Sequence, residues 1–359
     1  MVYLSDLGYN DDFSTAFDAL CLTDCVPARV IADYGGYLKV ASPEVGEAEV
    51  AGALLHVSEP HELPKVGDWV ALDPTNTSRA IIRAVLPRSS EINRKAAGTS
   101  CNRQVLATNV DIAFVVQALD FDFSPARLER YSYQLRQSNI EPIFIFNKAD
   151  KELDLATKMA LITQLGVPFI IATATIGAGI ENISAMITQA QTAVFLGSSG
   201  VGKSTLTNAL LGVQQQKTAP IRESDSTGRH TTSHRELFIL PGGGLIIDTP
   251  GIRELQLWGE EDYLVKSFGD IELLASACEF RNCSHTKETK CAVVEAIESG
   301  ELLASRLESY LKFKHELRTQ TFAAASESAK QKKLRARRIK KATQLDEKLA
   351  DDSDEWYGL

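Results

Sequence analysis

A chain of 359 residues is long enough for two or three domains, and 44% hydrophobic beside 24% charged residues is typical of a globular protein. No apolar run approaches the ~20 residues of a membrane-spanning helix, and the N-terminus lacks the basic and apolar stretches of a secretion signal. The net charge of −9 argues against a surface uniformly suited to nucleic acid. We therefore expect a cytoplasmic protein that does not enter a membrane.

The first hundred residues predict a small β-barrel behind a short leader. Residues 1–27 show little periodicity, which predicts a loosely docked leader. From residue 28 to residue 100 the chain has short β-rich runs with no helix-length stretch between them, and the turn signal Gly35-Gly36 separates the first two runs. About five strands fit this length, but their spacing alone does not distinguish an OB-fold from an SH3-like barrel.

Residues 101–256 instead alternate between strands and helices, which predicts an α/β fold with a largely parallel sheet covered on both faces. The expected strands are residues 111–116, 142–146, 169–172 and 192–196, and the expected helices are residues 125–137, 155–165, 180–190 and a helix that opens at Ser204.

A glycine-rich segment after the strand at 192–196 matches the phosphate-binding loop pattern in full. Glycines let successive backbone N–H groups turn toward phosphates at a helix N-terminus. Lys203 is expected to neutralise β- and γ-phosphate oxygens, and the Ser204 hydroxyl to bind Mg²⁺. The expected nucleotide-binding residues of this loop are Gly197, Ser198, Ser199, Gly200, Val201, Gly202, Lys203, Ser204 and Thr205.

A guanine-selecting motif, Asn147-Lys148-Ala149-Asp150, precedes this loop in the chain. Asp150 can accept two hydrogen bonds from guanine N1–H and N2–H₂, a pair that adenine lacks, which disfavours an ATP-dependent enzyme. Thr173 and Ala174, after the next strand, stand where a backbone amide could contact guanine O6. The base motif follows the phosphate loop in an ordinary small GTPase, so the order here is rotated.

Asp248-Thr-Pro-Gly251 follows an apolar strand, which predicts Asp248 as a Mg²⁺ ligand and the Gly251 N–H as a γ-phosphate contact. The polar segment 224–234 is expected to be a switch, in which Thr232, slightly favoured over Thr231, binds Mg²⁺. Ile252 stands where a glutamine commonly orients the attacking water, and an aliphatic chain cannot do so. His230 is therefore the candidate catalytic residue.

Three thiols and one imidazole, from Cys278, Cys283, His285 and Cys291, lie within 14 residues. That is the ligand set of a closed structural zinc site, so we expect one Zn²⁺ to stabilise a helical region over residues 257–320. The other cysteines, at positions 21, 25 and 101, have no matched histidine and are expected to be free thiols.

The segment 321–359 carries few large apolar residues and an uneven charge. Residues 328–341 hold eight Lys/Arg and no acid, whereas residues 342–359 hold six acids and one Lys. This extension is either a protruding helix or a segment that folds on binding. Its basic stretch could contact RNA phosphates or simply be a solvated face.

Together these motifs resemble the RsgA (YjeQ/EngC) family, the circularly permuted GTPases of bacterial small-ribosomal-subunit biogenesis, over about residues 28–318. The resemblance implies an OB-fold barrel, a permuted P-loop GTPase domain and a zinc-binding domain, with Zn²⁺ and with Mg²⁺ bound alongside GTP. It also implies a monomer that acts with the 30S subunit, 16S rRNA and GTP/GDP, with subunit-stimulated hydrolysis coupled to release. His230 and Ile252 match a known pair of the family, whereas Ser233 and Thr173 depart from its usual Thr and Ser.

Two hypotheses about the function remain open at this point. One is a GTPase that assists late maturation of the small subunit. The other is a GTP-dependent RNA-binding adaptor with negligible hydrolysis, against which the complete set of Lys203, Ser204 and Asp248 argues.

Overall fold

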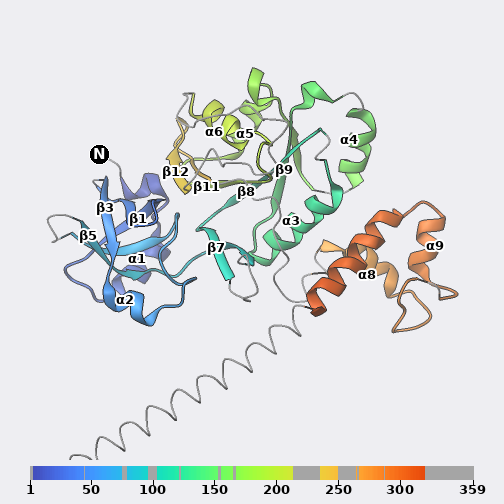
Figure 1. Ribbon diagram of the computed structural model, residues 1–359, viewed down its shortest axis with the longest axis horizontal. Helices are drawn as coiled ribbons and strands as arrows, with labels where there is room; N and C mark the ends of the chain where they lie inside the picture. Colours follow the sequence, from blue (N-terminus) through green and yellow to red (C-terminus); the bar gives the residue numbers. More distant parts are fainter. Residues whose placement is uncertain are drawn as a thin grey trace, which may run out of the picture.

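The computed structural model has three regions, shown in Figure 1: N-terminal strands (blue), a central α/β region (green to yellow) and a C-terminal helical region (orange to red). It describes residues 3–43, 45–74, 79–95, 103–120, 123–152, 155–164, 167–212, 235–249, 264, 267–286 and 288–319. Among these residues, no helix combines the length and the apolar character needed to cross a membrane.

The N-terminal strands close into a five-stranded barrel. They are β1 (Val26–Asp33), β2 (Leu38–Ala41), β3 (Val45–Val50), β4 (Trp69–Asp73) and β5 (Ala80–Val85), with helix α2 (Gly52–Val57) between β3 and β4. Their order is β1-β2-β3-β5-β4, and β1 also pairs with β4, which closes the barrel. The β3–β5 pairing is parallel while the others are antiparallel. This is the strand order of an OB-fold, which decides between the two barrels that the sequence left open.

The prediction that the leader docks loosely is wrong for its described part. It forms a 3₁₀ turn, η1 (Leu4–Leu7), and a helix, α1 (Asp11–Asp18), whose N-cap Asn10 accepts a hydrogen bond from the Phe13 N–H at 3.1 Å. Leu7 and Phe13 are buried, and the Tyr9 ring lies edge-on to Trp69 at 4.8 Å between centroids. The short apolar segments could not reveal this packing because their partners come from the barrel.

The central region is an α/β sheet with the expected parallel core. Its strands are β8 (Ile112–Ala118), β9 (Pro142–Asn147), β10 (Phe169–Ile171), β11 (Thr192–Leu196), β12 (Arg235–Ile239) and β13 (Leu245–Asp248). Strands β10-β9-β8-β11-β13 are parallel neighbours, and β12 joins the edge antiparallel. The helices are α3 (Pro125–Gln137), α4 (Leu155–Gln164), α5 (Ile180–Met186) and α6 (Lys203–Leu211), with 3₁₀ turns η2 (Ala149–Lys151) and η3 (Ala174–Ile176).

Helix α5 ends at Met186, four residues before the predicted end at Ala190. Ile187 adopts an extended conformation, and the Thr188 N–H is capped by the Gln191 side chain at 3.1 Å. Ala190 has a φ of 63°, in the left-handed region that ends helices. This local hydrogen-bonding competes with another helical turn.

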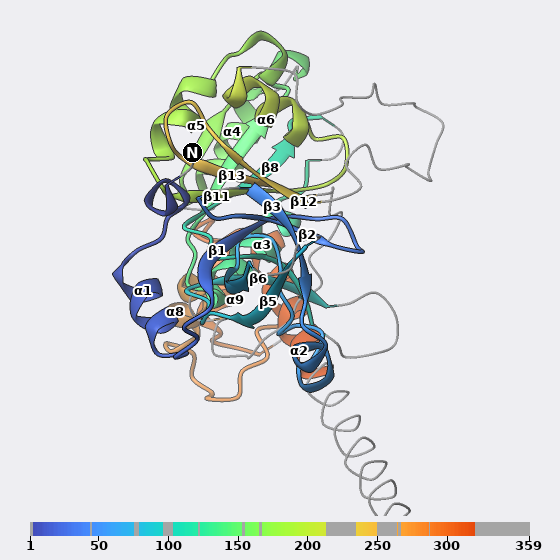
Figure 2. The ribbon, with the colours of Figure 1, turned by 90° about the vertical axis from the view of Figure 1, so that its left-hand side faces the viewer.

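The barrel and the α/β region share one sheet, as Figure 2 shows from the barrel side, because β12 pairs with β1 through Ala32–Glu236 and Asp33–Arg235. Strands β6 (Glu91–Lys95) and β7 (Arg103–Thr108) form a separate two-stranded ribbon between the two regions.

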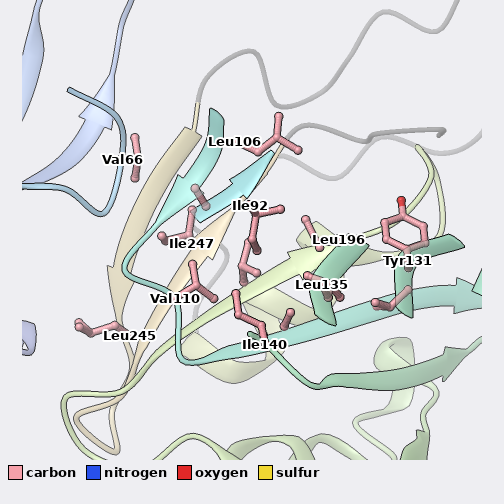
Figure 3. Packing of buried hydrophobic residues seen from close by; sticks show 14 of the residues in the cluster. Val66, Ile92, Leu106, Val110, Tyr131, Leu135, Ile140, Leu196, Leu245 and Ile247 are labelled. Carbon is pink, nitrogen blue, oxygen red and sulfur yellow. The ribbon is translucent and has the colours of Figure 1, made fainter. Parts of the chain in front are cut away.

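A continuous hydrophobic core crosses the same junction. Figure 3 shows Val66 of the barrel to one side of Ile92 and Leu106 of the ribbon, Ile247 of β13 and Leu135 of α3. All five residues belong to one buried cluster. The barrel is therefore fixed to the α/β region by packing rather than by a flexible tether.

The C-terminal region is helical, with α8 (Gly269–Ala275), α9 (Ala292–Glu298) and helical residues 304–319. Its own buried cluster includes Phe268, Tyr310 and Phe313, and the two phenylalanine rings meet edge-to-face at 5.4 Å. Tyr133 of α3 belongs to the same cluster, so this region packs on the α/β region through α3.

Candidate functional site

The predicted phosphate loop connects the end of β11 to the start of α6, as expected from the sequence. Gly197 and Gly202 both have positive φ, at 140° and 103°. A Cβ atom on Gly197 would lie 2.2 Å from the Val116 carbonyl oxygen, and one on Gly202 would lie 2.2 Å from Asn147 Nδ2. Only glycine fits at both positions, because the backbone has positive φ and neighbouring atoms leave no room for a Cβ atom. Such glycines are typical of a loop that wraps around phosphates.

Asn147 ties the two halves of the nucleotide site together, a role that its sequence motif alone did not reveal. Its Nδ2 donates to the Val201 carbonyl oxygen in the phosphate loop at 2.9 Å, and its Oδ1 accepts from the Ala174 N–H at 3.1 Å. The side chain is buried. The permuted motifs, far apart in sequence, thus meet at one edge of the sheet.

The substitution Gly202→Ala tests this arrangement. The added methyl group would displace Asn147 and force a left-handed alanine, so we expect guanine-nucleotide affinity to fall on the order of 100-fold. Titration with a fluorescent GDP analogue measures it. Gly212→Ala is the matched control, since Gly212 also has positive φ, 68°, but has no heavy atom within 4 Å of its would-be Cβ; equal losses in both variants would contradict the role assigned to Asn147.

The remaining predicted base-site residues also lie together. Lys148 has a φ of 60°, and its Nζ donates to Asp120 Oδ2 at 3.0 Å. The Ala149 N–H donates to the Ala172 carbonyl oxygen at 3.4 Å, and Thr173 is buried beside them. Asp150, on η2, is exposed, so its carboxylate is accessible to a base.

Lys203 lies inside the loop, where its Nζ donates to the carbonyl oxygens of Gly197 and Ser198, each at 2.9 Å. Burial lowers the pKa of this ammonium to about 8, and the nearby Asp248 opposes the shift. A bound phosphate would supply the missing negative charge and favour the protonated lysine.

Asp248 and Ser204 suit a Mg²⁺ ion. The Ser204 hydroxyl lies 3.4 Å from Asp248 Oδ2, while Asp248 Oδ1 is buried with no hydrogen-bond partner among the described residues. Burial raises the pKa of this carboxyl to about 6. Two hard oxygen ligands, one of them an unpaired buried carboxylate oxygen, are what Mg²⁺ prefers. The ion would neutralise the carboxylate and clamp phosphate oxygens.

Several predicted site residues lie outside the described residues. They are His230, Thr231, Thr232, Gly251 and Ile252, and their assignments remain predictions. The extension 321–359 and Cys101 lie outside as well.

The predicted zinc ligands form one cluster in the C-terminal region. The potential donor atoms of Cys278, Cys283, His285 and Cys291 all lie within 4.8 Å of one another. Cys278 Sγ is 3.7 Å from His285 Nδ1 and 3.9 Å from Cys291 Sγ, and the last two are 3.4 Å apart. A tetrahedron with metal–sulfur bonds of ~2.3 Å and a metal–nitrogen bond of ~2.0 Å has edges of roughly 3.5–3.8 Å, so the spacings among Cys278, His285 and Cys291 fit such an ion, and Cys283 lies within 4.8 Å of them.

Local chemistry supports metal binding by this cluster. His285 has a φ of 58°, a left-handed conformation that non-glycine residues seldom adopt. Burial lowers the pKa of His285, which keeps its imidazole neutral as a ligand must be. Three soft thiols beside one imidazole favour Zn²⁺ over harder cations.

One contact at the phosphate loop was not anticipated from the sequence. Arg127, near the start of α3, donates from Nη1 to the Ser198 hydroxyl at 3.1 Å. The helix itself was predicted at residues 125–137, where the structure has it, but an arginine on a predicted helix carries no signal of its partner.

A permuted phosphate loop, its base motif, an OB-fold and a Cys₃His cluster define the class of protein: a circularly permuted P-loop GTPase. The RsgA GTPase family model matches residues 85–258. The small ribosomal subunit biogenesis GTPase RsgA of Xylella fastidiosa strain M23 is 43% identical over 84% of this chain and 92% of its own. The protein of that name from Syntrophotalea carbinolica is 39% identical over 89% of this chain and 90% of its own.

Solved structures agree. YjeQ from Thermotoga maritima superposes with a TM-score of 0.59 at 25% identity, covering 82% of this chain and 98% of its own. YloQ, described as a circularly permuted GTPase, gives a TM-score of 0.55 at 26% identity, covering 83% of this chain and 96% of its own. The chain belongs to the RsgA family of GTPases.

Proposed function

We propose that this GTPase binds the small ribosomal subunit, assists its late maturation, and leaves when subunit-stimulated hydrolysis of GTP is complete. The relatives named above are small ribosomal subunit biogenesis GTPases. The observation that carries the proposal is the assembled nucleotide site, in which Asn147 bridges the phosphate loop and the Ala174 amide. Lys203, Ser204 and Asp248 provide the groups for a Mg²⁺–GTP complex.

The OB-fold offers a surface for the proposed contact with 16S rRNA. Tyr34 and Tyr37 flank the β1–β2 turn, with stacked rings 5.1 Å apart, and the Arg79 guanidinium lies over the Tyr37 ring at 4.7 Å. The β1–β2 loop is one of the two loops with which OB-folds bind oligonucleotides, and exposed aromatic rings stack on unpaired bases. Arg79 also pairs with Glu47 and Glu49, so this surface supplies stacking more than phosphate attraction.

His230 is proposed to position the attacking water, because Ile252 cannot. We expect slow intrinsic hydrolysis, because a histidine would orient the attacking water less well than the usual glutamine. Binding of the subunit would then raise the rate by fixing the switch segment 224–234, and hydrolysis would release it.

Turnover of GTP with and without purified 30S subunits tests the proposal. We expect stimulation of about 10²-fold or more, because a positioned general acid or base contributes typically 10²–10⁴-fold. His230→Ala should lower the stimulated rate by about 10²-fold. Equal turnover in the presence and absence of subunits would contradict the proposed partner. Unchanged single-turnover rates for His230→Ala would instead favour the adaptor with negligible hydrolysis.

A further inference from the structure

Helix α3 lies between the nucleotide site and the helical region that holds the Cys₃His cluster. Leu128, Tyr131 and Leu135 bury one side of the helix in the main core. Tyr133 faces the other way and belongs to the core of the C-terminal region, where its ring meets Phe313 edge-on at 6.3 Å. The helix is therefore packed on two sides by two different parts of the chain.

At its N-terminal end, α3 contacts the phosphate loop. Arg127 Nη1 lies 3.1 Å from the hydroxyl of Ser198, which is buried. The carbonyl oxygen of Ser198 in turn accepts from Lys203 Nζ at 2.9 Å. Arg127 is thus connected through one residue to the lysine that would bind the phosphates.

Two residues further along, α3 is held by a buried ion pair from the C-terminal region. Arg306 Nη1 donates to Glu129 Oε1 at 2.8 Å, and the two side chains are only 17% and 8% exposed. The same guanidinium reaches Asp270 Oδ1 at 2.8 Å and the Ser267 carbonyl oxygen at 3.0 Å. Its carbon also lies 4.9 Å from the Phe268 ring centroid. Arg306 therefore joins two parts of the C-terminal region to α3: its own helix and the segment 267–270 at the start of α8.

A second ion pair repeats this connection one residue later. Arg130 donates to both carboxylate oxygens of Glu316, at 2.7 and 3.2 Å, and its guanidinium lies 5.0 Å from the centroid of Phe313. Bidentate pairs fix orientation as well as distance. Two ion pairs at adjacent residues therefore tie α3 to the C-terminal region.

We propose that α3 couples the C-terminal region, which holds the Cys₃His cluster, to the phosphate loop. In this proposal Arg127 positions Ser198, and the Glu129–Arg306 ion pair holds α3 in the place that allows it. The residues 127 and 129 are ~3 Å apart along the helix axis, so a rigid helix cannot shift at one without shifting at the other. Leaving the nearly buried Glu129 carboxylate without Arg306 is strongly unfavourable, because an unpaired charge would remain buried. The ion pair is therefore either fully formed or fully broken, with few states between. Displacing the C-terminal region therefore lowers nucleotide affinity by moving Ser198 and Lys203, with no substitution of a group that would touch the nucleotide.

A double-mutant cycle on the full-length, zinc-loaded protein tests this coupling. The variants are Arg127→Met, Arg306→Met and the double substitution, and the readout is affinity for a fluorescent GDP analogue with no ribosomal subunit present. We expect each single variant to bind about five- to tenfold more weakly, and the double variant to bind no more weakly than the weaker single variant. Lys290→Met is the matched control, because it removes an ion pair to Glu279 on the exposed surface of the same region; its affinity should stay within about twofold of the parent.

Glu129→Gln provides a milder form of the test, since it keeps the side-chain shape and removes only the charge. Metal content and thermal melting of each variant show whether the C-terminal region is still folded.

Additive losses in the double variant, or parent-like affinity in both Arg306→Met and Glu129→Gln, would overturn the proposal. The inference rests on the nucleotide site described above, and the two fail differently: a parent protein that binds no GDP would refute that site, whereas a parent that binds GDP without coupling would refute only the role of α3.

Discussion

Removing the metal from the Cys₃His cluster is expected to unfold the helical region over residues 267–319 while the barrel and sheet stay folded. That region has a small core, and a structural zinc ion can supply ~10 kcal/mol or more to such a fold. Cys283→Ser removes one ligand and should have the same effect as a strong chelator. The measurement is metal content together with limited proteolysis, which should cut within the C-terminal region and spare the central sheet.

Cys21→Ser serves as the control for this experiment, because Cys21 is an exposed free thiol far along the chain from the cluster. It should retain one metal ion and the parent's proteolytic pattern. If Cys283→Ser also retains the metal and the pattern, the four residues do not form a structural metal site. Reversal of the chelator effect by added Zn²⁺ would identify the ion.

The second large effect is expected from Asp150→Asn, which should change the base that the site prefers. The carboxylate is proposed to accept hydrogen bonds from guanine N1–H and N2–H₂, and an amide in its place presents an N–H₂ group to one of them. We expect GTP affinity to fall by about 10³-fold or more, because sites built on such hydrogen bonds reject a mismatch by ~10⁴. Xanthosine nucleotides, with an oxygen at the C2 position, should gain affinity in the variant.

Competition between GTP, ATP and XTP for a fluorescent nucleotide measures this change in preference. Glu141→Gln is the matched control, because it removes the same charge from a side chain that is 75% exposed and paired with Arg136. An Asp150→Asn variant that still prefers GTP would contradict the assignment of this carboxylate. Preferential binding of ATP by the parent would contradict it more directly.

Much of the fold was predictable because its local signals are strong. The strand 192–196 and the helix 125–137 were predicted with the bounds that the structure has for β11 and α3. Each begins or ends at an unambiguous signal, such as Pro125 after the N-cap Ser124. The leader was misjudged since its Leu7 and Phe13 are buried by residues from the barrel rather than by their own neighbours.

The barrel type and the junction depend on pairings between distant strands. The parallel β3–β5 pairing identifies the OB-fold, and β12 joins β1 across some 200 residues of chain. Arg29 shows how such a junction is invisible in sequence. It is fully buried, contacts Leu7, Gly67, Asn109 and Thr192 from three regions, and burial lowers its pKa to about 10.

For the candidate site, the sequence predicts the chemistry: a lysine and glycines for phosphates, an aspartate for guanine, and three thiols with an imidazole for a metal. These residue types at such spacings predict that chemistry, because few other arrangements use them. The contacts between the motifs are visible only in the tertiary structure. Asn147 bridges two motifs, Asp248 Oδ1 has no hydrogen-bond partner in the described part of the chain, and α3 lies between Ser198 and Arg306. Such contacts join residues up to 186 positions apart, and no local pattern specifies which surfaces will meet once the chain is folded.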